Sequence, residues 1–127
     1  MLGLKNVVVF LGDGTDTLAT GVPPDSLSEL YVNFPEPGID LVTPDFIRGA
    51  HRSLQLGGRF VLVTDDGNIA MKAGRSLSRM QDLFESDCPG GRDYIKGTPE
   101  EHGTSFFDRL WTDKGFEKRY YTAFRKI

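Results

Sequence analysis

The sequence has little cysteine and little histidine. Its 127 residues include one cysteine, Cys88, and two histidines, His51 and His102. A single cysteine excludes a disulfide framework and a multi-cysteine zinc site, and it favours a reducing compartment, either the cytoplasm or the nucleus. Because the two histidines lie far apart in the sequence, they do not favour a metal site either. We therefore expect a protein without a bound metal.

Long hydrophobic runs and a secretory leader are also absent from the sequence. A run such as Val7–Leu11 is far too short to cross a bilayer. Residues 1–20 lack a basic start followed by a long apolar stretch, so they do not have the pattern of a signal peptide. Hydrophobic residues make up 39% of the chain and charged residues 26%, which is typical of a globular protein and favours no membrane partner.

The formal net charge is −3, which does not favour a nucleic-acid-binding protein for the chain as a whole. The charge is unevenly distributed. Residues 1–47 contain one basic residue against seven acids, whereas residues 109–127 contain six basic residues against two acids. The basic tail is either a nucleic-acid-binding segment or the solvated face of a strand or loop.

Patterns typical of strands and helices alternate along most of the chain. Continuous apolar runs predict buried strands at residues 7–11, 30–34 and 59–64. A helix is predicted to begin at the N-cap Thr43, with Pro44 at its first helical position, and to stop at Gly57. A second helix is predicted over about residues 68–84, where apolar residues recur on one face. This alternation predicts the α/β class with a mostly parallel sheet.

The last third of the sequence has a different pattern. Residues 86–104 are rich in glycine, proline and charge, which predicts a long loop. Residues 105–111 and 116–124 are rich in aromatic side chains, which predicts a carboxyl-terminal antiparallel strand pair.

Acidic residues follow each of the three predicted buried strands. Asp13 follows the first strand, Glu36 the second, and Asp65 and Asp66 the third. In open α/β sheets, ligands bind outside the carboxyl ends of the strands, where aligned carboxylates can bind hydroxyl or amino groups. The alternative is that these acids cap turns and helix starts.

Short motifs follow one another in a specific order along nearly the whole chain. In sequence order they are Gly12-Asp13, Asp25-Ser26-Leu27, Tyr31-Val32-Asn33-Phe34-Pro35-Glu36-Pro37, Thr43-Pro44-Asp45-Phe46, Leu56-Gly57-Gly58-Arg59, Thr64-Asp65, Ser105-Phe106-Phe107-Asp108 and Lys114-Gly115. This order resembles the S-adenosylmethionine-dependent tRNA (guanine-N7) methyltransferase family. The Asn-Phe-Pro-acid-Pro segment is the most specific part of the resemblance.

The resemblance implies a site role for five residues, with S-adenosylmethionine as the cofactor and tRNA as the substrate. Glu36 would occupy the family's catalytic, cofactor-proximal position, and Asp13 a position beside the adenosine part of the cofactor. Asp65, Ser105 and Asp108 would bind the target guanine. Methyl transfer to N7 is a direct displacement that needs alignment and acceptors for the N–H edge of guanine, which carboxylates supply.

The resemblance also implies that parts of the family's fold are missing. The family begins with two further strands and a glycine-rich cofactor loop, and it carries a basic run after the Asn-Phe-Pro motif, where this chain has Gly38-Ile39-Asp40-Leu41-Val42. The implied architecture is a Rossmann-like sheet truncated at its amino-terminal side, in a single partial methyltransferase-like domain over residues 1–127. Glu36 is one methylene longer than the family's aspartate.

The missing strands would leave the predicted strand at residues 7–11 without neighbours. Because an exposed apolar strand promotes aggregation, we expect it either to move beside the strand at residues 30–34 or to pair with another chain. The second case would give a homo-oligomer or a partner chain that completes the sheet.

Three functions remain open at this point. The first is a tRNA (guanine-N7) methyltransferase that is degenerate or incomplete and inactive alone, because the cofactor loop and the basic run are absent. The alternative is a non-catalytic interaction protein that uses the remaining fold as a partner-binding or dimerisation surface. The third is a small-ligand- or metal-binding module that uses the acidic residues at the strand ends.

Overall fold

The computed structural model describes residues 5–9, 11–36, 40–99 and 118–127. Its helices and strands, in chain order, are α1 (Gly14–Asp16), the π-helix η1 (Thr17–Gly21), β1 (Leu27–Asn33), α2 (Pro44–Ser53), β2 (Leu54–Thr64), α3 (Gly67–Ser78), β3 (Phe84–Ser86), the 3-10 helix η2 (Pro89–Gly91), β4 (Ile95–Lys96) and β5 (Tyr120–Lys126).

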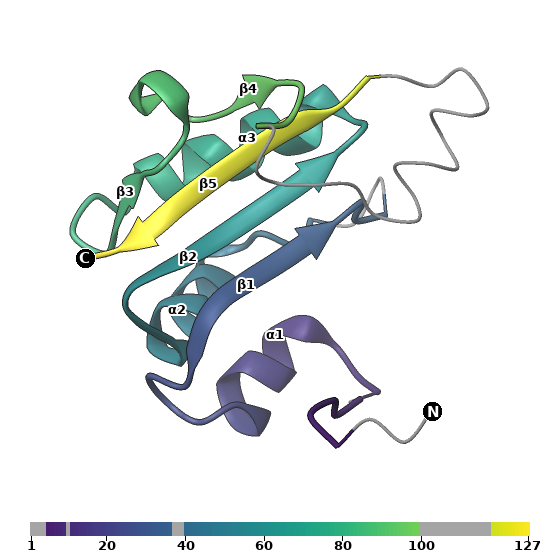
Figure 1. The fold of residues 1–127 in the computed structure, drawn as a ribbon, viewed down its shortest axis with the longest axis vertical. Coiled ribbons are helices and arrows are strands. Elements are labelled where there is room, and N and C mark those ends of the chain that lie inside the picture. The colour runs from purple at the N-terminus through teal and green to yellow at the C-terminus, as the bar shows by residue number, and fades with distance from the viewer. Residues whose placement is uncertain (1–4, 10, 37–39, 100–117) are drawn as a thin grey trace.

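The strands form one five-stranded mixed sheet (Figure 1). The order is β1-β2-β5-β3, and β4 also pairs with β5. β1 and β2 are parallel, with Leu30 opposite Phe60. The pairings of β5 with β2, β3 and β4 are antiparallel. The predicted α/β class is confirmed; the parallel part of the sheet is the β1–β2 pair, and the rest is antiparallel.

Helix α2 begins where the sequence predicts it but ends before the predicted stop at Gly57, because Leu54 already begins β2. The Thr43 side chain caps the helix by accepting a hydrogen bond from the Phe46 N–H at 3.2 Å, and Pro44 lies in its first turn. Phe46, Ile47 and Ala50 then bury one face of the helix against the sheet. The helix ends at Ser53, and the chain enters β2 at once.

Helix α3 is shorter than the predicted helix at residues 68–84. Asp66 caps it by accepting from the Asn68 N–H at 2.9 Å, but the helix ends at Ser78. The chain then turns at Met80, whose carbonyl accepts from the Phe84 N–H at 3.0 Å, and Phe84 begins the edge strand β3. No helix in the part of the chain that the structure describes is long and apolar enough to span a membrane.

The sheet has a helix-covered face, against which α2 and α3 pack (Figure 1). Side chains of β2, β3 and β5 fill this core with those of the helices; its largest members are Phe46, Ile47, Leu54, Phe60, Leu62, Leu77, Phe84 and Phe124. The opposite face carries a smaller cluster, made by Val61, Val63, Cys88, Tyr121 and Ala123.

The predicted strand at residues 7–11 is wrong for the part that the structure describes. Residues 5–9 form no strand, and the side chains of Val8, Val9 and Leu11 are 74%, 76% and 105% exposed. Among the described residues, β1 has β2 as its only paired strand, so the expected move beside residues 30–34 does not occur. Pairing of this segment with another chain stays a prediction.

The segment after this apolar run is attached to α2 rather than to the sheet. The Arg52 guanidinium donates hydrogen bonds to the carbonyls of Leu18, Ala19 and Val22 at 3.1, 3.2 and 3.3 Å, which lie in η1 or directly after it. Gly49 allows this contact, because a Cβ there would lie 3.1 Å from Leu18 Cβ. An apolar strand with no neighbour to accept its backbone hydrogen bonds is not formed.

The predicted carboxyl-terminal strand pair is confirmed in one member. β5 overlaps the predicted strand at residues 116–124, but it lies between β2 and β3 and does not form a separate hairpin. Its predicted partner, residues 105–111, lies outside the described residues. The predicted loop at residues 86–104 contains the short strand β4 in its described part.

Candidate functional site

A cavity of about 290 Å³ lies beyond the carboxyl ends of β1 and β2. The segment after β1 and the first turns of α3 form its walls. The lining residues are Pro35, Asp40, Leu41, Val42, Asp66, Asn68, Ile69, Lys72 and Ala73. The lining combines apolar side chains with acidic, amide and basic groups, which is the usual composition of a small-molecule site.

The cavity wall after β1 depends on an unusual backbone conformation at Phe34. This residue has a φ of 50°, in the left-handed region that bulky side chains rarely adopt. Its N–H donates to the Val63 carbonyl at 2.7 Å, and the Arg119 guanidinium lies 5.2 Å from the centre of its ring. The turn at Phe34 ends the strand and sends Pro35 to the cavity. Strained residues of this kind are concentrated at functional sites.

The cavity wall after β2 is built by a short chain of hydrogen bonds. Thr64 ends the strand, and its hydroxyl accepts from the Asp66 N–H at 3.1 Å. Asp66 then caps α3 through Asn68. One Asp66 oxygen therefore orients the helix, while the residue itself lines the cavity.

Two of the predicted site residues come together at this end of the sheet. Because β1 and β2 are parallel, Glu36 and Asp65, which follow them, lie at the same edge. Both side chains are exposed. Each is the chain neighbour of a residue that lines the cavity, Pro35 for Glu36 and Asp66 for Asp65. Glu36 and Asp65 thus follow the two parallel strands at one edge of the sheet, and their role in a binding site stays a prediction.

Asp13, a third predicted site residue, is not part of this arrangement. Asp13 caps α1, with its Oδ1 atom accepting from the Thr15 N–H at 2.6 Å and the Asp16 N–H at 3.4 Å. The structure thus shows for Asp13 the helix-capping role that was the alternative interpretation. Ser105 and Asp108 lie outside the described residues.

Three polar residues of the cavity were missed by sequence reasoning: Asp40, Asn68 and Lys72. Asn68 and Lys72 are one turn apart at the start of α3, so they face the same direction. Spacing from the N-cap Asp66 is a signal that would have placed them near the strand end. Asp40 carries no comparable signal, because it lies in a segment without regular structure.

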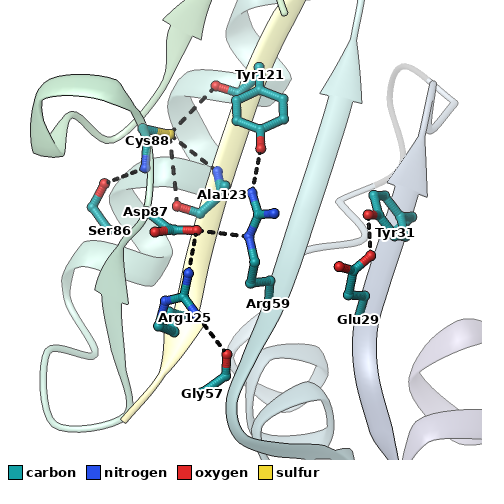
Figure 2. Close-up of polar contacts among 10 residues, drawn as sticks. All are labelled: Glu29, Tyr31, Gly57, Arg59, Ser86, Asp87, Cys88, Tyr121, Ala123 and Arg125. Carbon is teal, nitrogen blue, oxygen red and sulfur yellow. Dashed lines mark hydrogen bonds and ion pairs between the residues drawn. The ribbon is translucent and has the colours of Figure 1, made fainter. Parts of the chain in front are cut away.

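A second polar cluster lies on the sheet face opposite the helices (Figure 2). The Asp87 carboxylate forms one ion pair with Arg59 Nε at 2.8 Å and another with an Arg125 guanidinium nitrogen at 3.0 Å. Arg59 also donates to the Tyr121 hydroxyl at 2.7 Å, and Arg125 to the Gly57 carbonyl at 3.0 Å. These bonds fasten β2, β5 and the segment after β3 to one another.

Burial and charge change the pKa of several groups around this cluster. Burial raises the pKa of the Tyr121 hydroxyl, although Arg59 opposes the change. Burial lowers the pKa of Arg59, but Tyr121 and Asp87 outweigh it, so that pKa is raised. On β1, a hydrogen bond to Glu29 raises the pKa of Tyr31. None of these shifts gives a group that exchanges protons near neutral pH.

Cys88 is buried behind this cluster (Figure 2). Its sulfur lies 3.2 Å from the Ala123 N–H, which donates to it, and burial raises the pKa of the thiol. A thiol in this environment is a poor nucleophile. Within the described ranges, no group of three or more histidine, cysteine or acidic residues is arranged to hold a metal ion.

Comparison with known proteins identifies the class of the chain. Residues 1–89 match the protein family described as "Putative methyltransferase". Because this match covers more than half of the chain, the chain belongs to that methyltransferase family.

The curated relatives are tRNA (guanine-N7) methyltransferases. The protein of that name from Chlamydia pneumoniae is 30% identical over 131 residues, a match that covers 97% of this chain and 55% of the relative. The one from Methylococcus capsulatus is 34% identical over 97 residues, covering 71% of this chain and 42% of the relative. The chain thus spans about half the length of the curated relatives it matches.

A solved structure with a similar arrangement is the geranyl diphosphate C-methyltransferase from Streptomyces coelicolor, in complex with S-adenosyl-L-homocysteine among other ligands. The two are 15% identical with a TM-score of 0.48, and the match covers 87% of this chain and 52% of that one.

The described residues fit part of an S-adenosylmethionine molecule. Asp40 and Asp66 at the cavity supply carboxylate acceptors for hydroxyl and amino groups. The cavity volume lies at the lower end of the range for small-molecule sites, about 300–1,000 Å³. Gly12 and Gly14 flank a helix cap rather than a loop at the cavity. The described cavity therefore suits one portion of such a ligand and does not surround all of it.

Proposed function

We propose that this chain carries the substrate side of a tRNA (guanine-N7) methyltransferase that uses S-adenosylmethionine. The supporting observation is that Glu36 and Asp65, two acids of the family motifs, follow parallel strands, and each is the chain neighbour of a residue that lines one cavity. Family membership and the tRNA (guanine-N7) methyltransferases among its relatives favour this reaction over other methyl transfers.

S-adenosylmethionine supplies the methyl group when it is bound. The chain's own residues have to hold the guanine so that its N7 lone pair points at that methyl group, because alignment is the main requirement of a direct displacement. Asp65 accepts hydrogen bonds from the N–H groups of guanine, which fixes the plane of the base. Glu36 lies on the adjacent strand end and orients the reacting groups from the other side.

Transfer of a labelled methyl group to a tRNA transcript tests this proposal. In an arm that transfers the methyl group we expect label on guanine N7, and a loss of about 100-fold in Glu36→Gln and Asp65→Asn, since misplacement of about 1 Å has an effect of this size. Asp45→Asn is the matched control, because Asp45 is an exposed acid of α2 that pairs with Arg48 at 3.1 Å.

The assay has a second arm because the chain covers 55% of the Chlamydia pneumoniae relative. In this arm the chain is fused to the part of that relative that it does not cover. Methyl transfer in either arm, lost with Glu36→Gln, supports the proposal. If neither the chain nor the fusion transfers a methyl group to tRNA, the catalytic proposal is wrong.

A second candidate function is a non-catalytic interaction protein. The observation that favours it is the apolar segment at Val8, Val9 and Leu11, whose side chains are almost fully exposed in the single chain. Exposed apolar surface of this kind marks interaction sites. Light scattering of the purified protein tests the self-association version: a dimer that becomes monomeric with Val8→Ser/Leu11→Ser supports it, and a monomeric wild type argues against it.

A further inference from the structure

Three basic residues on α3 form no ion pair or side-chain hydrogen bond with any other described residue. Lys72 and Arg75 lie on the exposed side of the helix, and Arg79 is its C-cap residue. We call these three residues the α3 ridge. α3 itself contains no acidic residue between Gly67 and Ser78 that would neutralise them.

Most other basic residues of the described structure are engaged within the fold. Arg48 pairs with Asp45, and Arg59 and Arg125 pair with Asp87. Arg52 binds carbonyls of η1, Arg119 lies over Phe34, and Lys126 pairs with Asp25 at 2.9 Å. The described members of the basic tail considered in the sequence are mostly among these engaged groups. The α3 ridge places three basic residues without such a partner on one helix, so its positive charge remains available to a binding partner.

Helix geometry places the three ridge residues on one side. They are at positions i, i+3 and i+7, which lie within about 60° of arc and extend about 10 Å along the axis. The opposite side of the helix carries Ala70, Ala73 and Leu77, which are buried against the sheet. In a duplex each strand carries one phosphate per about 3.4 Å of helix axis, so the ridge is long enough to contact two or more successive phosphates.

The ridge begins at the candidate site. Lys72 lines the cavity beyond the carboxyl ends of β1 and β2, and Arg75 and Arg79 follow one and two turns further along α3. Asp40 and Asp66 line the cavity together with Lys72. Further along α3, Asp93 accepts a hydrogen bond from Ser78. A Cβ at Gly74 would meet Asp93 at 2.8 Å, so Asp93 lies on the packed side of the helix.

We propose that the α3 ridge binds the phosphate backbone of the RNA whose guanine enters the cavity. The identification of the partner as RNA rests on the proposed function. Lys72 holds a phosphate beside the target nucleotide, and Arg75 and Arg79 hold the strand as it leaves the cavity. Contacts of this kind position the substrate and carry no sequence information of their own.

Binding of a fluorescent tRNA transcript, measured by anisotropy over a series of salt concentrations, tests the ridge. Arg75→Gln/Arg79→Gln is the informative variant, because neither residue lines the cavity. We expect it to weaken binding on the order of 10-fold near 0.1 M salt and to lower the slope of log affinity against log salt by about 1.4–1.8, for two lost phosphate contacts. Arg75→Lys/Arg79→Lys should keep the slope.

Lys5→Gln/Arg48→Gln is the matched control, since it removes the same charge from residues outside α3. We expect it to change affinity by less than about twofold, because net charge alone acts weakly at this salt concentration. If the ridge variant binds tRNA as the control does, or if the wild-type protein does not bind tRNA, the inference is overturned.

The methyl-transfer assay separates this inference from the proposed function. In an active arm, Arg75→Gln/Arg79→Gln should raise KM for tRNA and leave kcat unchanged, because the reacting groups are untouched. If neither arm transfers a methyl group but the ridge variant still loses tRNA affinity, the proposed reaction fails and the ridge stands. Methyl transfer with an unchanged KM in the ridge variant would overturn the ridge alone.

Discussion

The two faces of the sheet are closed in different ways. On the helix-covered face, large apolar side chains of β2 and β5 pack against α2 and α3, and Phe60, Leu62 and Phe124 are almost completely buried. On the opposite face, the small cluster around Tyr121 is bordered by Arg59, Asp87 and Arg125, whose side chains are 28%, 29% and 40% exposed. Apolar burial thus dominates one face, and an ion-pair network borders the other.

The two faces therefore differ in how much of their surface the fold itself covers. The helix-covered face is complete within the described chain, and it fixes the strand ends that hold Glu36 and Asp65. The opposite face stays partly open, and Tyr31 of β1 is 46% exposed there. Three substitutions and one change of pH test this difference between the two faces, from the largest expected effect to the smallest.

Removing a large side chain from the helix-covered face should have the largest effect. Phe60→Ala deletes a buried ring that packs against Phe46, with ring centres 6.0 Å apart. We expect a loss of about 3–5 kcal/mol in the free energy of unfolding, from lost burial and the remaining void. Urea unfolding followed by circular dichroism measures it. A loss below about 1 kcal/mol would show that this face does not dominate stability.

Removing the shared carboxylate of the opposite face should have a smaller effect. Asp87→Ala leaves Arg59 and Arg125 side by side without their common partner. Because these groups are partly exposed to solvent, we expect a loss of about 1–2 kcal/mol by the same measurement. Asp87→Asn, which keeps the shape but not the charge, should lose about half as much. Equal losses for Phe60→Ala and Asp87→Ala would contradict the distinction between the two faces.

Alkaline pH should weaken the opposite face through Cys88. Burial raises the pKa of this thiol above its ordinary value of 9.0, so the unfolded thiol ionises first. The folded state then binds more protons, and stability falls as pH rises through the interval between the two pKa values. We expect the free energy of unfolding to fall as pH rises above about 9.0, the ordinary pKa of the thiol, and to fall less in Cys88→Ala. An identical fall in both proteins would rule out this thiol as the cause.

An exposed ion pair on the outside of α2 should have the smallest effect. Arg48 and Asp45 pair at 3.1 Å, with side chains that are largely in solvent. Arg48→Ala should change the free energy of unfolding by about 0.3–0.5 kcal/mol, as for other exposed helix pairs. A loss as large as that of Asp87→Ala would show that the ion pairs at the sheet are no stronger than an exposed pair on a helix.

The parts of the fold that the sequence predicted well are those with local signals. Thr43 and Pro44 mark the start of α2, and its apolar spacing identifies the buried face. The run from Arg59 to Thr64 is apolar on both faces, as expected for the central strand β2. These features follow from a few neighbouring residues, so they do not depend on how distant segments pack.

The parts that were missed depend on distant partners. Residues 7–11 have strong strand propensity, yet a strand forms only where a neighbour can pair with it. Apolar spacing continues past Ser78 to Phe84. It therefore could not show that the helix ends before Phe84 and that Phe84 pairs with Lys126 in the sheet. The order of strands around β5 has no local signal at all.

The candidate site was predictable to a similar extent. Motifs placed Glu36 and Asp65 after two strands, and parallel pairing brings these two strand ends together. The cavity wall was not predictable, because Lys72 and Asn68 reach it only through the orientation of α3 on the sheet. That orientation is fixed by Ala70, Ala73 and Leu77, whose contacts lie far away in the sequence.

Chemical-shift mapping of the isotope-labelled protein with a tRNA transcript tests the central claim most directly, namely that RNA binds at the carboxyl ends of β1 and β2. The account predicts changes in the backbone signals of Asp40, Asn68 and Ile69 around the cavity and of Arg75 on α3. Changes confined to the opposite face, around Arg59 and Tyr121, would contradict it, as would a spectrum that tRNA leaves unchanged.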